Sequence, residues 1–510
     1  MPRLAAGPPA GDRVRAAGEQ RRLAKAADTD SGNEAAPAEV GAGAPLESDG
    51  ILPVLTDEAL AARVDAQRRY LGERAIFEDV DGRPVPALAS DEDPETRVED
   101  DILDALPGSS GIGDAAVDNS HRANGNALGL YVPIEHPAGG KSSLTHFHQA
   151  LAELQQGKRK KVRIATYGAS HTQADVYPGY MRTYLQTRFG DAGHGYMALA
   201  KTNKWFKHRD FGVENTKGWR IDHAQKREGR KDGLYGLMGA DASSSSKRDK
   251  TRVYPRDRGN PASMASHFEV QYLQQPGGGK FTVYADGKKL KTVNTKADDV
   301  GPGRYNFELP LGHHEIEIKL RGNGEVRLFG IIMEKEAPGV VLDTLGIAGT
   351  RAANMLNWDE ALWSDYIRDR PPDLWTLAYG TNETTDVDQP IEDYVDRLRQ
   401  VIMRFRNAAP EASCLLIGPG DFPRKLDDES WVPRPRLAQI VEAQRNVAYE
   451  MGCGYWDALA FMGGTGSMHT WATSSPQMGS RDHIHLTKRG YVRMGMGVTD
   501  AMMAGFDGRH

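Results

Sequence analysis

The 510-residue chain has only two cysteines, Cys414 and Cys453, so it lacks the disulfide framework that small secreted domains use. Cys414 heads an apolar, strand-like run and Cys453 follows a predicted helix, and we expect two buried thiols. The chain also lacks an apolar run long enough to span a bilayer, and its N-terminus lacks the charged-then-apolar pattern of a secretory signal. Taken literally, these absences predict a soluble cytoplasmic protein. A trimmed or mis-started sequence would look the same, so the sequence leaves localisation open.

Charge of one sign is not in excess either. The chain has 64 Lys and Arg against 70 Asp and Glu, a formal net charge of -6, which argues against a general affinity for nucleic acid or anionic membranes. The pair His313-His314 has no cysteine or carboxylate cluster at metal-ligand spacing nearby, so we expect a structural role for it. We expect no metal and no other cofactor, and the oligomeric state stays open.

The first 120 residues have few aromatics and are dominated by Ala, Gly, Glu, Asp, Pro and Arg. Such a segment buries too little apolar surface to offset its ordering entropy, so we expect residues 1–120 to be a disordered segment or a tether. A helical patch from Asp57 to Arg74 is the local exception.

Beyond residue 140, strand-like and helix-like patterns alternate. We expect strands over Val162–Thr166, Val340–Leu345, Asp373–Tyr379 and Ser413–Ile417, and helices over Leu144–Leu154, Tyr177–Phe189, Ala352–Ile367, Ile391–Asn407, Arg436–Met451 and Lys488–Ala504. Such alternation is typical of an α/β fold, a parallel sheet with helices on both faces.

Residues 198–337 have a different character. Lys-, Ser- and Gly-rich loops separate period-two strands, with turns such as Gln275 to Gly279 and Asp286-Gly287. We therefore expect a small antiparallel β-sandwich inserted into an α/β domain made of residues 140–197 and 338–510.

A serine stands where the first α/β strand gives way to a helix. The strand runs into Gly168-Ala169-Ser170, and the amphipathic stretch Tyr177–Phe189 follows. This layout exposes the hydroxyl at the carboxyl edge of the sheet, with helix N-terminal amides behind it. A lone Gly-x-Ser turn is more often structural, so Ser170 becomes a candidate nucleophile only in combination with the other motifs of the chain.

An acid and a base for this serine lie far downstream. A serine hydroxyl needs a base to take its proton, and an imidazole is suited to that task near neutral pH. The Asp-x-x-His spacing favours His485 as the base with Asp482 as its partner, over the competing His483. The amides of Ser170 and Gly349 and the side-chain amide of Asn382 would supply three donors to an oxyanion.

Four blocks in this order, around Ser170, Gly349, Asn382 and His485, resemble the conserved blocks of the SGNH/GDSL hydrolases. They are Gly168-Ala169-Ser170-His171, Gly346-Ile347-Ala348-Gly349, Gly380-Thr381-Asn382-Glu383 and Asp482-His483-Ile484-His485-Leu486-Thr487. The resemblance covers roughly residue 144 to the C-terminus. It implies a flavodoxin-like fold, nucleophile Ser170, base His485 with partner Asp482, and an oxyanion hole of Ser170, Gly349 and Asn382.

The longer segments Leu185–Gly193 and Met462–Met468, with the inserted β-sandwich, resemble the bacterial peptidoglycan and polysaccharide O-acetylesterase branch. In that branch the insert is similar to a carbohydrate-binding module and the protein is periplasmic or secreted. The chain departs from the family at two positions, where Asp is usual and Ala169 and Glu383 stand here. An Asp beside the serine usually helps fix the oxyanion loop, so Ala169 bears on rate more than on identity.

Two further residues are candidates for a substrate pocket. His171 follows the proposed nucleophile, although an ordinary helix-start residue is equally plausible there. Trp471, after the Gly463–Met468 loop, could form the wall for an acyl group or a sugar ring, and plain loop packing is an even alternative.

These features predict a metal-independent serine esterase that removes O-acetyl or another small acyl group from a carbohydrate through an acyl-enzyme. Two alternatives stay open. One is an O-acetyltransferase with the same triad, and the other is a catalytically weakened polysaccharide-binding protein. The predicted partner is an O-acetylated glycan.

Overall fold

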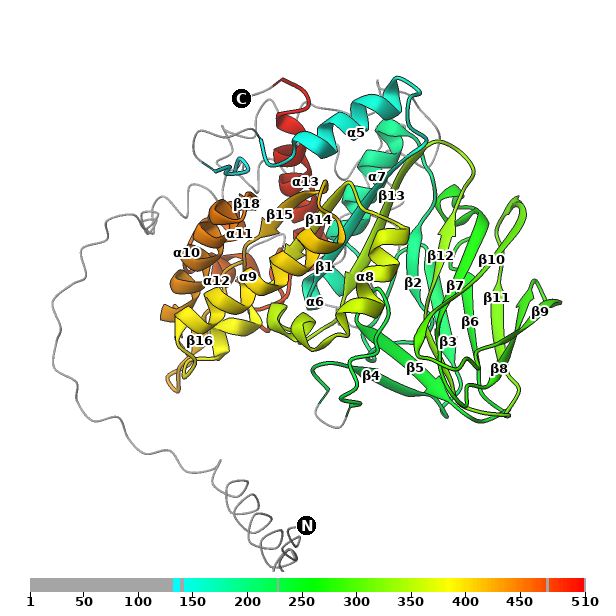
Figure 1. Cartoon of the computed structure of the whole chain (residues 1–510). Coiled ribbons are helices and arrows are strands. Elements are labelled where there is room, and N and C mark those ends of the chain that lie inside the picture. The colour runs from blue at the N-terminus through cyan, green and yellow to red at the C-terminus, as the bar shows by residue number, and fades with distance from the viewer. Residues whose placement is uncertain (1–131, 138–141, 227–228, 474–476, 509–510) are drawn as a thin grey trace, which may run out of the picture. The chain divides into compact units, whose positions relative to one another are not determined.

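A computed structural model describes residues 132–137, 142–226, 229–473 and 477–508 (Figure 1). All of them fall within one compact unit. The predicted tether over 1–120 and the predicted helical patch Asp57 to Arg74 lie outside the described residues. In the described part, no helix is both long and apolar enough to cross a membrane.

A five-stranded parallel sheet forms the centre of the α/β part. Its spatial order is β13-β1-β14-β15-β18. The strands are β1 (Lys161–Gly168), β13 (Gly339–Gly346), β14 (Leu374–Ala378), β15 (Ser413–Ile417) and β18 (Gly454–Trp456). Counted along the chain, this is the order 2-1-3-4-5 of flavodoxin-like sheets. The predicted fold class is confirmed.

Helices cover both faces of this sheet (Figure 1). One face carries α5 (Thr145–Gln155), α7 (Tyr177–Phe189) and α13 (Lys488–Ala504), and the other carries α8 (Glu360–Asp369), α9 (Ile391–Ala408) and α10 (Pro435–Glu450). The strands alternate to serve both layers. Ile164 packs with the first group and Ala165 with the second, and both are buried. Burial on both faces explains why these strands read as continuous apolar runs.

The inserted β region, strands β2 to β12, forms two antiparallel sheets. One has the order β10-β7-β12-β5-β4, with β2 also paired to β12, and the other has the order β3-β6-β11-β8-β9. The strands are β2 (Gly195–Ala198), β3 (Phe211–Asn215), β4 (Arg220–His223), β5 (Ala240–Ser244), β6 (Lys250–Pro255), β7 (Ala265–Gln274), β8 (Lys280–Ala285), β9 (Lys288–Asn294), β10 (Gly301–Gly312), β11 (Ile316–Leu320) and β12 (Val326–Glu334). These sheets fit the predicted β insertion, while the exact domain boundaries stay a prediction.

The β region packs directly against α8. Tyr366 of α8 donates its hydroxyl hydrogen to the carbonyl oxygens of Tyr272 (3.0 Å) and Gly303 (3.2 Å). Buried side chains of both parts belong to one hydrophobic cluster. The inserted strands therefore share a continuous core with the α/β sheet.

The helix predicted over Ala352–Ile367 is divided. A 3-10 helix covers Ala352–Asn357, and α8 begins at Glu360. The division occurs because Asp359 is extended and its Oδ1 accepts the Leu362 amide at 2.8 Å, which is an N-cap. An aspartate before an apolar face was the signal for this helix start.

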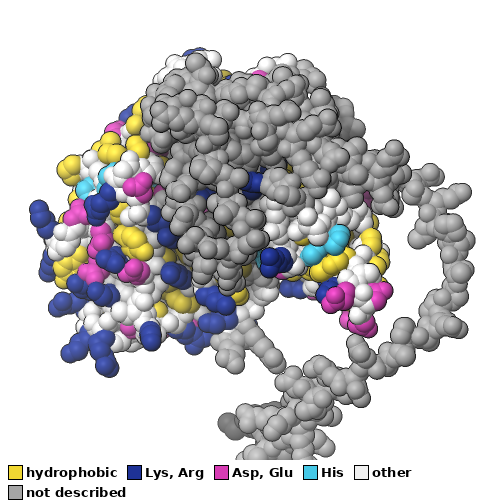
Figure 2. Space-filling view, turned by 180° about the vertical axis from the view of Figure 1, so that it is seen from behind, with side chains coloured by type: hydrophobic (Ala, Val, Ile, Leu, Met, Phe, Trp, Pro, Cys, Tyr) yellow, Lys and Arg dark blue, Asp and Glu magenta, His cyan; other side chains and the backbone are white. Residues whose placement is uncertain are grey.

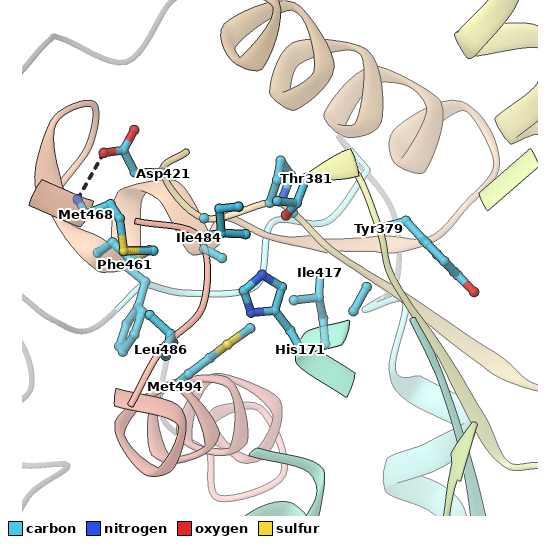
Figure 3. Close-up of a pocket in the computed structure, with 16 residues that line it drawn as sticks. His171, Tyr379, Thr381, Ile417, Asp421, Phe461, Met468, Ile484, Leu486 and Met494 are labelled. Carbon is cyan, nitrogen blue, oxygen red and sulfur yellow. Dashed lines mark hydrogen bonds between the residues drawn. The ribbon is translucent and has the colours of Figure 1, made fainter. Parts of the chain in front are cut away.

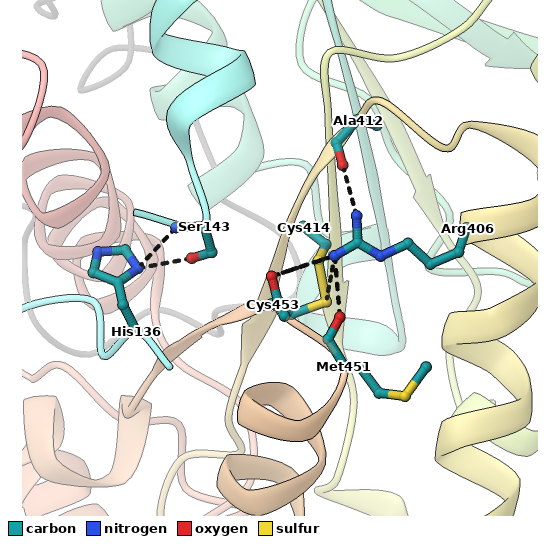
Figure 4. Close-up of a disulfide and its surroundings, with 8 residues drawn as sticks. His136, Ser143, Arg406, Ala412, Cys414, Met451 and Cys453 are labelled. Atoms are coloured by element: carbon teal, nitrogen blue, oxygen red, sulfur yellow. Dashed lines mark hydrogen bonds between the residues drawn. A yellow bond between two sulfur atoms is a disulfide. The ribbon is translucent and has the colours of Figure 1, made fainter. Parts of the chain in front are cut away.

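The prediction of two buried thiols is wrong, because Cys414 and Cys453 form a disulfide (Figure 4). Cys414 lies on β15 and Cys453 immediately precedes β18, and these two strands are neighbours in the sheet. Their Cα atoms are 4.9 Å apart, within the range that a disulfide bridges. The pairing of β15 with β18 creates this proximity, and β18 was not predicted.

Shorter elements surround the carboxyl edge of the sheet. They are α6 (Ser170–Gln173), α11 (Ala458–Met462), α12 (Ser467–Thr473), a 3-10 helix over Asn382–Thr385 and the hairpin of β16 (Arg424–Lys425) and β17 (Trp431–Val432). The loops that follow β1, β13, β14 and β15 meet here, which is where ligand sites of open α/β sheets lie.

Candidate active site

Ser170 lies two residues after the end of β1, the second strand in the spatial order of the sheet, and is the first residue of α6. Gly168 makes this sharp turn possible. A Cβ at that position would lie 2.0 Å from Thr172 Oγ1 and 2.9 Å from the Ala378 carbonyl oxygen. Because the first amides of a helix have no intrahelical partner, the Ser170 amide is available as a donor at this turn.

Ser170, His485 and Asp482 come together although 315 positions separate the serine from the histidine. Ser170 Oγ lies 2.9 Å from His485 Nε2, and His485 Nδ1 lies 2.6 Å from Asp482 Oδ2. A carboxylate only accepts hydrogen bonds, so Nδ1 carries the hydrogen and Nε2 accepts from the serine hydroxyl. The three side chains form one hydrogen-bonded row.

The turn at Asp482 is held by its own carboxylate. Oδ1 accepts the amides of Ile484 (3.0 Å) and His485 (2.9 Å). Burial alone would raise the pKa of Asp482, but the hydrogen bonds from the His485 ring and from these amides outweigh it and lower that pKa to about 2. Asp482 is thus ionised at neutral pH and holds the imidazole in one orientation. The side chains of His485 and Asp482 remain 39% and 46% exposed.

The predicted oxyanion donors lie on two neighbouring loops. Gly349 follows β13 with φ at 79°, a backbone conformation that favours glycine. Asn382 Nδ2 donates one of its two hydrogens to the Thr350 carbonyl oxygen at 2.8 Å, so this bond joins the loop of Asn382 to the loop of Gly349. The second hydrogen of the same amide is not needed for that bond.

Gln173 fixes the Gly349 loop from the side of α6. Its Oε1 accepts the Ala348 amide at 2.9 Å, one residue before Gly349. Gln173 is 3% exposed. The sequence analysis missed this residue, and the only available signal was a polar side chain on the buried side of the short helix after Ser170.

The two positions that depart from the family lie in tight surroundings. Ala169 is buried in the core. Glu383 is also buried, and its carboxylate accepts the amides of Ala352 (2.9 Å) and Gly380 (3.0 Å). Burial raises the pKa of Glu383, and these amides partly offset that rise. Glu383 thus ties the Asn382 loop to the segment after Gly349.

His171 lines a small apolar cavity of ≈ 30 Å³ (Figure 3). Its ring centroid lies 5.4 Å from that of His485, and its Nδ1 lies 2.9 Å from the Tyr491 hydroxyl. Burial, and then the nearby charge of His485, lower the pKa of His171 to about 3, so its imidazole is neutral at physiological pH. Further lining residues are Ile417, Asp421, Phe461, Met468, Ile484, Leu486 and Met494.

Trp471, expected either as a pocket wall or in plain loop packing, is not among the residues that line this cavity. It is 1% exposed and packs edge-on against Phe461 with ring centroids 5.9 Å apart. Phe461 lines the cavity. Trp471 therefore packs behind Phe461, within the same buried hydrophobic cluster.

His483, the competing base, is held elsewhere. Its Nε2 lies 3.1 Å from His469 Nδ1 and its Nδ1 lies 3.0 Å from the Arg481 carbonyl oxygen. The ring stacks on Trp431, with centroids 3.7 Å apart. His483 also takes a positive φ of 55°, so the sharp turn directs it away from the row that His485 joins.

One group of described side chains has the composition of a metal site. Asp175, His194 and His208 are buried, and their ligand atoms all lie within 4.8 Å of one another. However, Asp175 Oδ1 already accepts from Arg182 (2.8 Å) and Thr344 (2.7 Å). A guanidinium thus supplies the positive charge beside this carboxylate. We assign no metal to this buried cluster, and the expectation of no metal stays a prediction.

One protein family matches part of the chain. The family model described as GDSL-like lipase/acylhydrolase matches residues 321–493, which include Gly349, Asn382, Asp482 and His485. No curated protein matches the chain.

Among solved structures, a peptidoglycan O-acetylesterase is 22% identical, with a TM-score of 0.61, and the match covers 74% of this chain and 99% of that one. This likeness shows a shared fold. A family two carbohydrate esterase from Cellvibrio japonicus is 11% identical, covering 58% and 99% with a TM-score of 0.24. A salicylyl-acyltransferase from a tetracycline biosynthetic pathway is 15% identical, covering 61% and 97% with a TM-score of 0.26.

Proposed function

Because residues 321–493 match the GDSL-like lipase/acylhydrolase family, we propose that the chain is an ester hydrolase that removes O-acetyl groups from a carbohydrate through an acyl-enzyme on Ser170. The observation that carries the proposal is the row of Ser170 Oγ, His485 and Asp482, with steps of 2.9 and 2.6 Å. That row is the arrangement by which a general base activates a serine hydroxyl.

The first step forms the acyl-enzyme. Ser170 Oγ attacks the ester carbonyl carbon while its proton moves to His485 Nε2. The ionised Asp482 stabilises the imidazolium that results. The carbonyl oxygen becomes an oxyanion, and the amides of Ser170 and Gly349 with the second hydrogen of Asn382 Nδ2 are its proposed donors.

The first step ends when the bond between the carbonyl carbon and the sugar oxygen breaks and His485 passes its proton to that oxygen, which leaves the acyl group on Ser170. The second step regenerates the enzyme. A water then gives its proton to His485 and attacks the acyl carbon, which releases acetate and restores the serine hydroxyl. The exposure of the His485 and Asp482 side chains to solvent supports water as the acceptor.

The proposed substrate class comes from the similar solved structure and from the cavity beside His171. The similar structure with a TM-score of 0.61 is a peptidoglycan O-acetylesterase, and we propose a related O-acetylated glycan for this chain. The cavity beside His171, ≈ 30 Å³ with apolar walls, supports a short acyl group over a long one.

The test compares the full-length protein with its Ser170→Ala variant. Wild type should hydrolyse p-nitrophenyl acetate and release acetate from at least one of a panel of O-acetylated glycans that includes peptidoglycan. The variant should lose roughly 10⁴-fold or more of kcat on both while its unfolding midpoint stays the same. Undiminished turnover by a folded variant would overturn the role of Ser170, and acetate release from none of the glycans would overturn the substrate class.

A further inference from the structure

Trp205 is an exposed indole on a loop whose backbone is fixed. Its side chain is 57% exposed, the highest exposure among the tryptophans that the structure describes. Its neighbour Phe206 is 2% exposed and packs into the core. The Trp205 amide donates to Asn203 Oδ1 at 2.9 Å. The chain therefore presents this ring to solvent from a tethered position.

This loop is bound to the helix of Ser170. Gln173, three residues after Ser170, accepts at Oε1 from Thr202 Oγ1 (3.1 Å) and Asn203 Nδ2 (2.9 Å) and donates from Nε2 to Asn203 Oδ1 (3.2 Å). The same Oε1 accepts the Ala348 amide. The side-chain amide of Gln173 therefore joins the Trp205 loop, the end of α6 and the Gly349 loop.

These bonds connect the Trp205 loop to α6, the helix that begins at Ser170. Two residues of extended chain span at most roughly 7 Å, which bounds the separation of the Asn203 and Trp205 Cα atoms. Residues three apart on a helix have Cβ atoms roughly 5–6 Å apart, which bounds the step from Gln173 to Ser170. A polymer whose ester reaches Ser170 can thus extend across Trp205.

The surroundings of Trp205 carry positive charge. Lys201, Lys204 and Lys207 are all exposed, and Lys204 Nζ lies 4.4 Å from the indole centroid. The back view shows further Lys and Arg side chains spread over the β region (Figure 2). The whole chain has a formal net charge of -6, so the three lysines of this loop are not part of a general excess of positive charge.

We propose that Trp205 and the lysines at 201, 204 and 207 form a binding subsite for an acidic glycan beside the Ser170 site. The proposal rests on the proposed function. The indole face, which carries the negative part of the ring quadrupole, packs against the C–H face of a sugar ring. The ammonium groups attract carboxylates along the same polymer. The subsite would place an acetyl ester of a neighbouring sugar at Ser170.

The experiment measures kcat/KM for three esters: acetylated polygalacturonate, which carries carboxylates, acetylated cello-oligosaccharides, which carry none, and p-nitrophenyl acetate. Each is assayed with wild type, Trp205→Ala, Trp205→Tyr, Lys204→Gln and the control Leu311→Ala, an exposed side chain of the β region. Binding to a polygalacturonate affinity gel is measured in parallel for Ser170→Ala with and without Trp205→Ala, at low and high salt.

For Trp205→Ala, the ratio of kcat/KM on the acidic polymer to that on p-nitrophenyl acetate should fall about tenfold, mainly through KM. Trp205→Tyr should recover most of the loss, and Leu311→Ala should keep the wild-type ratio. Lys204→Gln should reduce the preference for the acidic polymer over the neutral one, and salt should reduce it further.

Suppose that wild type releases acetate from the polymer and that Trp205→Ala has the same ratio of kcat/KM on the acidic polymer to kcat/KM on p-nitrophenyl acetate. Trp205 would then be an ordinary exposed residue, and the subsite alone would be overturned. Equal losses on acidic and neutral polymers would overturn the acidic class. If wild type releases no acetate from any polymer, the proposed function fails. The gel then decides the subsite by whether Trp205→Ala weakens retention of Ser170→Ala.

Discussion

Two clusters of histidine and carboxylate flank the short helix α6. Ser170, at its start, meets His485 and Asp482, whose side chains are 39% and 46% exposed. Asp175, just beyond its end, meets Arg182, His194, His208 and Asp210, whose side chains are 0 to 4% exposed. The two clusters thus meet the chain at Ser170 and Asp175, only five positions apart, yet one group is in contact with solvent and the other is buried.

Charge compensation separates the two clusters. In the buried one, Arg182 lies 2.8 Å from Asp175 and 3.7 Å from Asp210. Burial alone would raise the pKa of Asp175, but the charges of Arg182 and the two histidines hold it below its ordinary value. In the exposed row, Asp482 is held by backbone amides and His485 faces the serine. A buried, compensated cluster stabilises the fold, whereas an exposed row is able to exchange protons with substrate and water.

The largest expected effect is on rate, from Asp482→Asn. The amide would leave His485 in the wrong tautomer, so kcat on p-nitrophenyl acetate should fall roughly 10⁴-fold at neutral pH. Because the side chain is half exposed, the free energy of unfolding should change by less than about 1 kcal/mol. Steady-state kinetics and urea unfolding measure the two. A rate loss below tenfold would contradict the role of Asp482.

Asp175→Asn should show the reverse pattern. Removing Asp175 breaks the shortest ion pair of the buried Arg182 and leaves it with Asp210 at 3.7 Å, so the free energy of unfolding should fall by about 3–5 kcal/mol. Urea unfolding measures it, with Asp298→Asn, an exposed carboxylate of the β region, as the matched control at less than about 0.5 kcal/mol. Equal effects of Asp175→Asn and Asp298→Asn on the free energy of unfolding would contradict a stabilising role for the buried cluster.

Asn382→Ala tests the oxyanion donors. Loss of one donor typically costs about 3 kcal/mol of barrier, so kcat should fall roughly 10²–10³-fold with little change in KM. The bond to the Thr350 carbonyl oxygen is lost as well, so circular dichroism and the unfolding midpoint serve as the control. A raised KM with an unchanged kcat would instead indicate a binding role.

The smallest effect concerns pH and the buried cluster. Burial lowers the pKa of His208 to about 3 in the folded protein, against about 6.5 for an unperturbed histidine. Between these values the unfolded chain binds a proton that the folded one does not, so stability falls as pH falls from about 6.5 towards 3. His208→Phe should reduce this slope by at most about 1.4 kcal/mol per pH unit. Identical slopes from unfolding at pH 4.5, 5.5 and 6.5 would contradict this.

The strongly periodic elements could be predicted from the sequence. α7 and α13 begin and end where the pattern placed them, and β15 covers the predicted Ser413–Ile417. Strand β18 has only three residues, too few for a period to show. Its absence from the prediction also hid the disulfide, because Cys414 and Cys453 become neighbours only when β18 pairs with β15.

The residues of the candidate site also differ in whether the local sequence predicts them. Ser170, Asn382 and His485 each lie in a short block with its own spacing, so the blocks pointed to them before any geometry was known. Gln173 and Phe461 gain their positions from packing between segments far apart in the chain, and a single sequence does not encode that locally. For Trp471 the sequence left a pocket wall and plain loop packing as even alternatives, since its place after a Gly-rich loop gave no sign that it would pack against Phe461.

The bridge between Cys414 and Cys453 closes a loop of 39 positions that contains the whole of α10. Closing a loop of that length restricts the unfolded chain by about 4 kcal/mol in the chain-entropy model. The covalent link thus supplements the few backbone hydrogen bonds that an edge strand of three residues is able to form. The stability of β18 at the edge of the sheet therefore depends on whether the medium in which the chain folds is oxidising enough to form the disulfide.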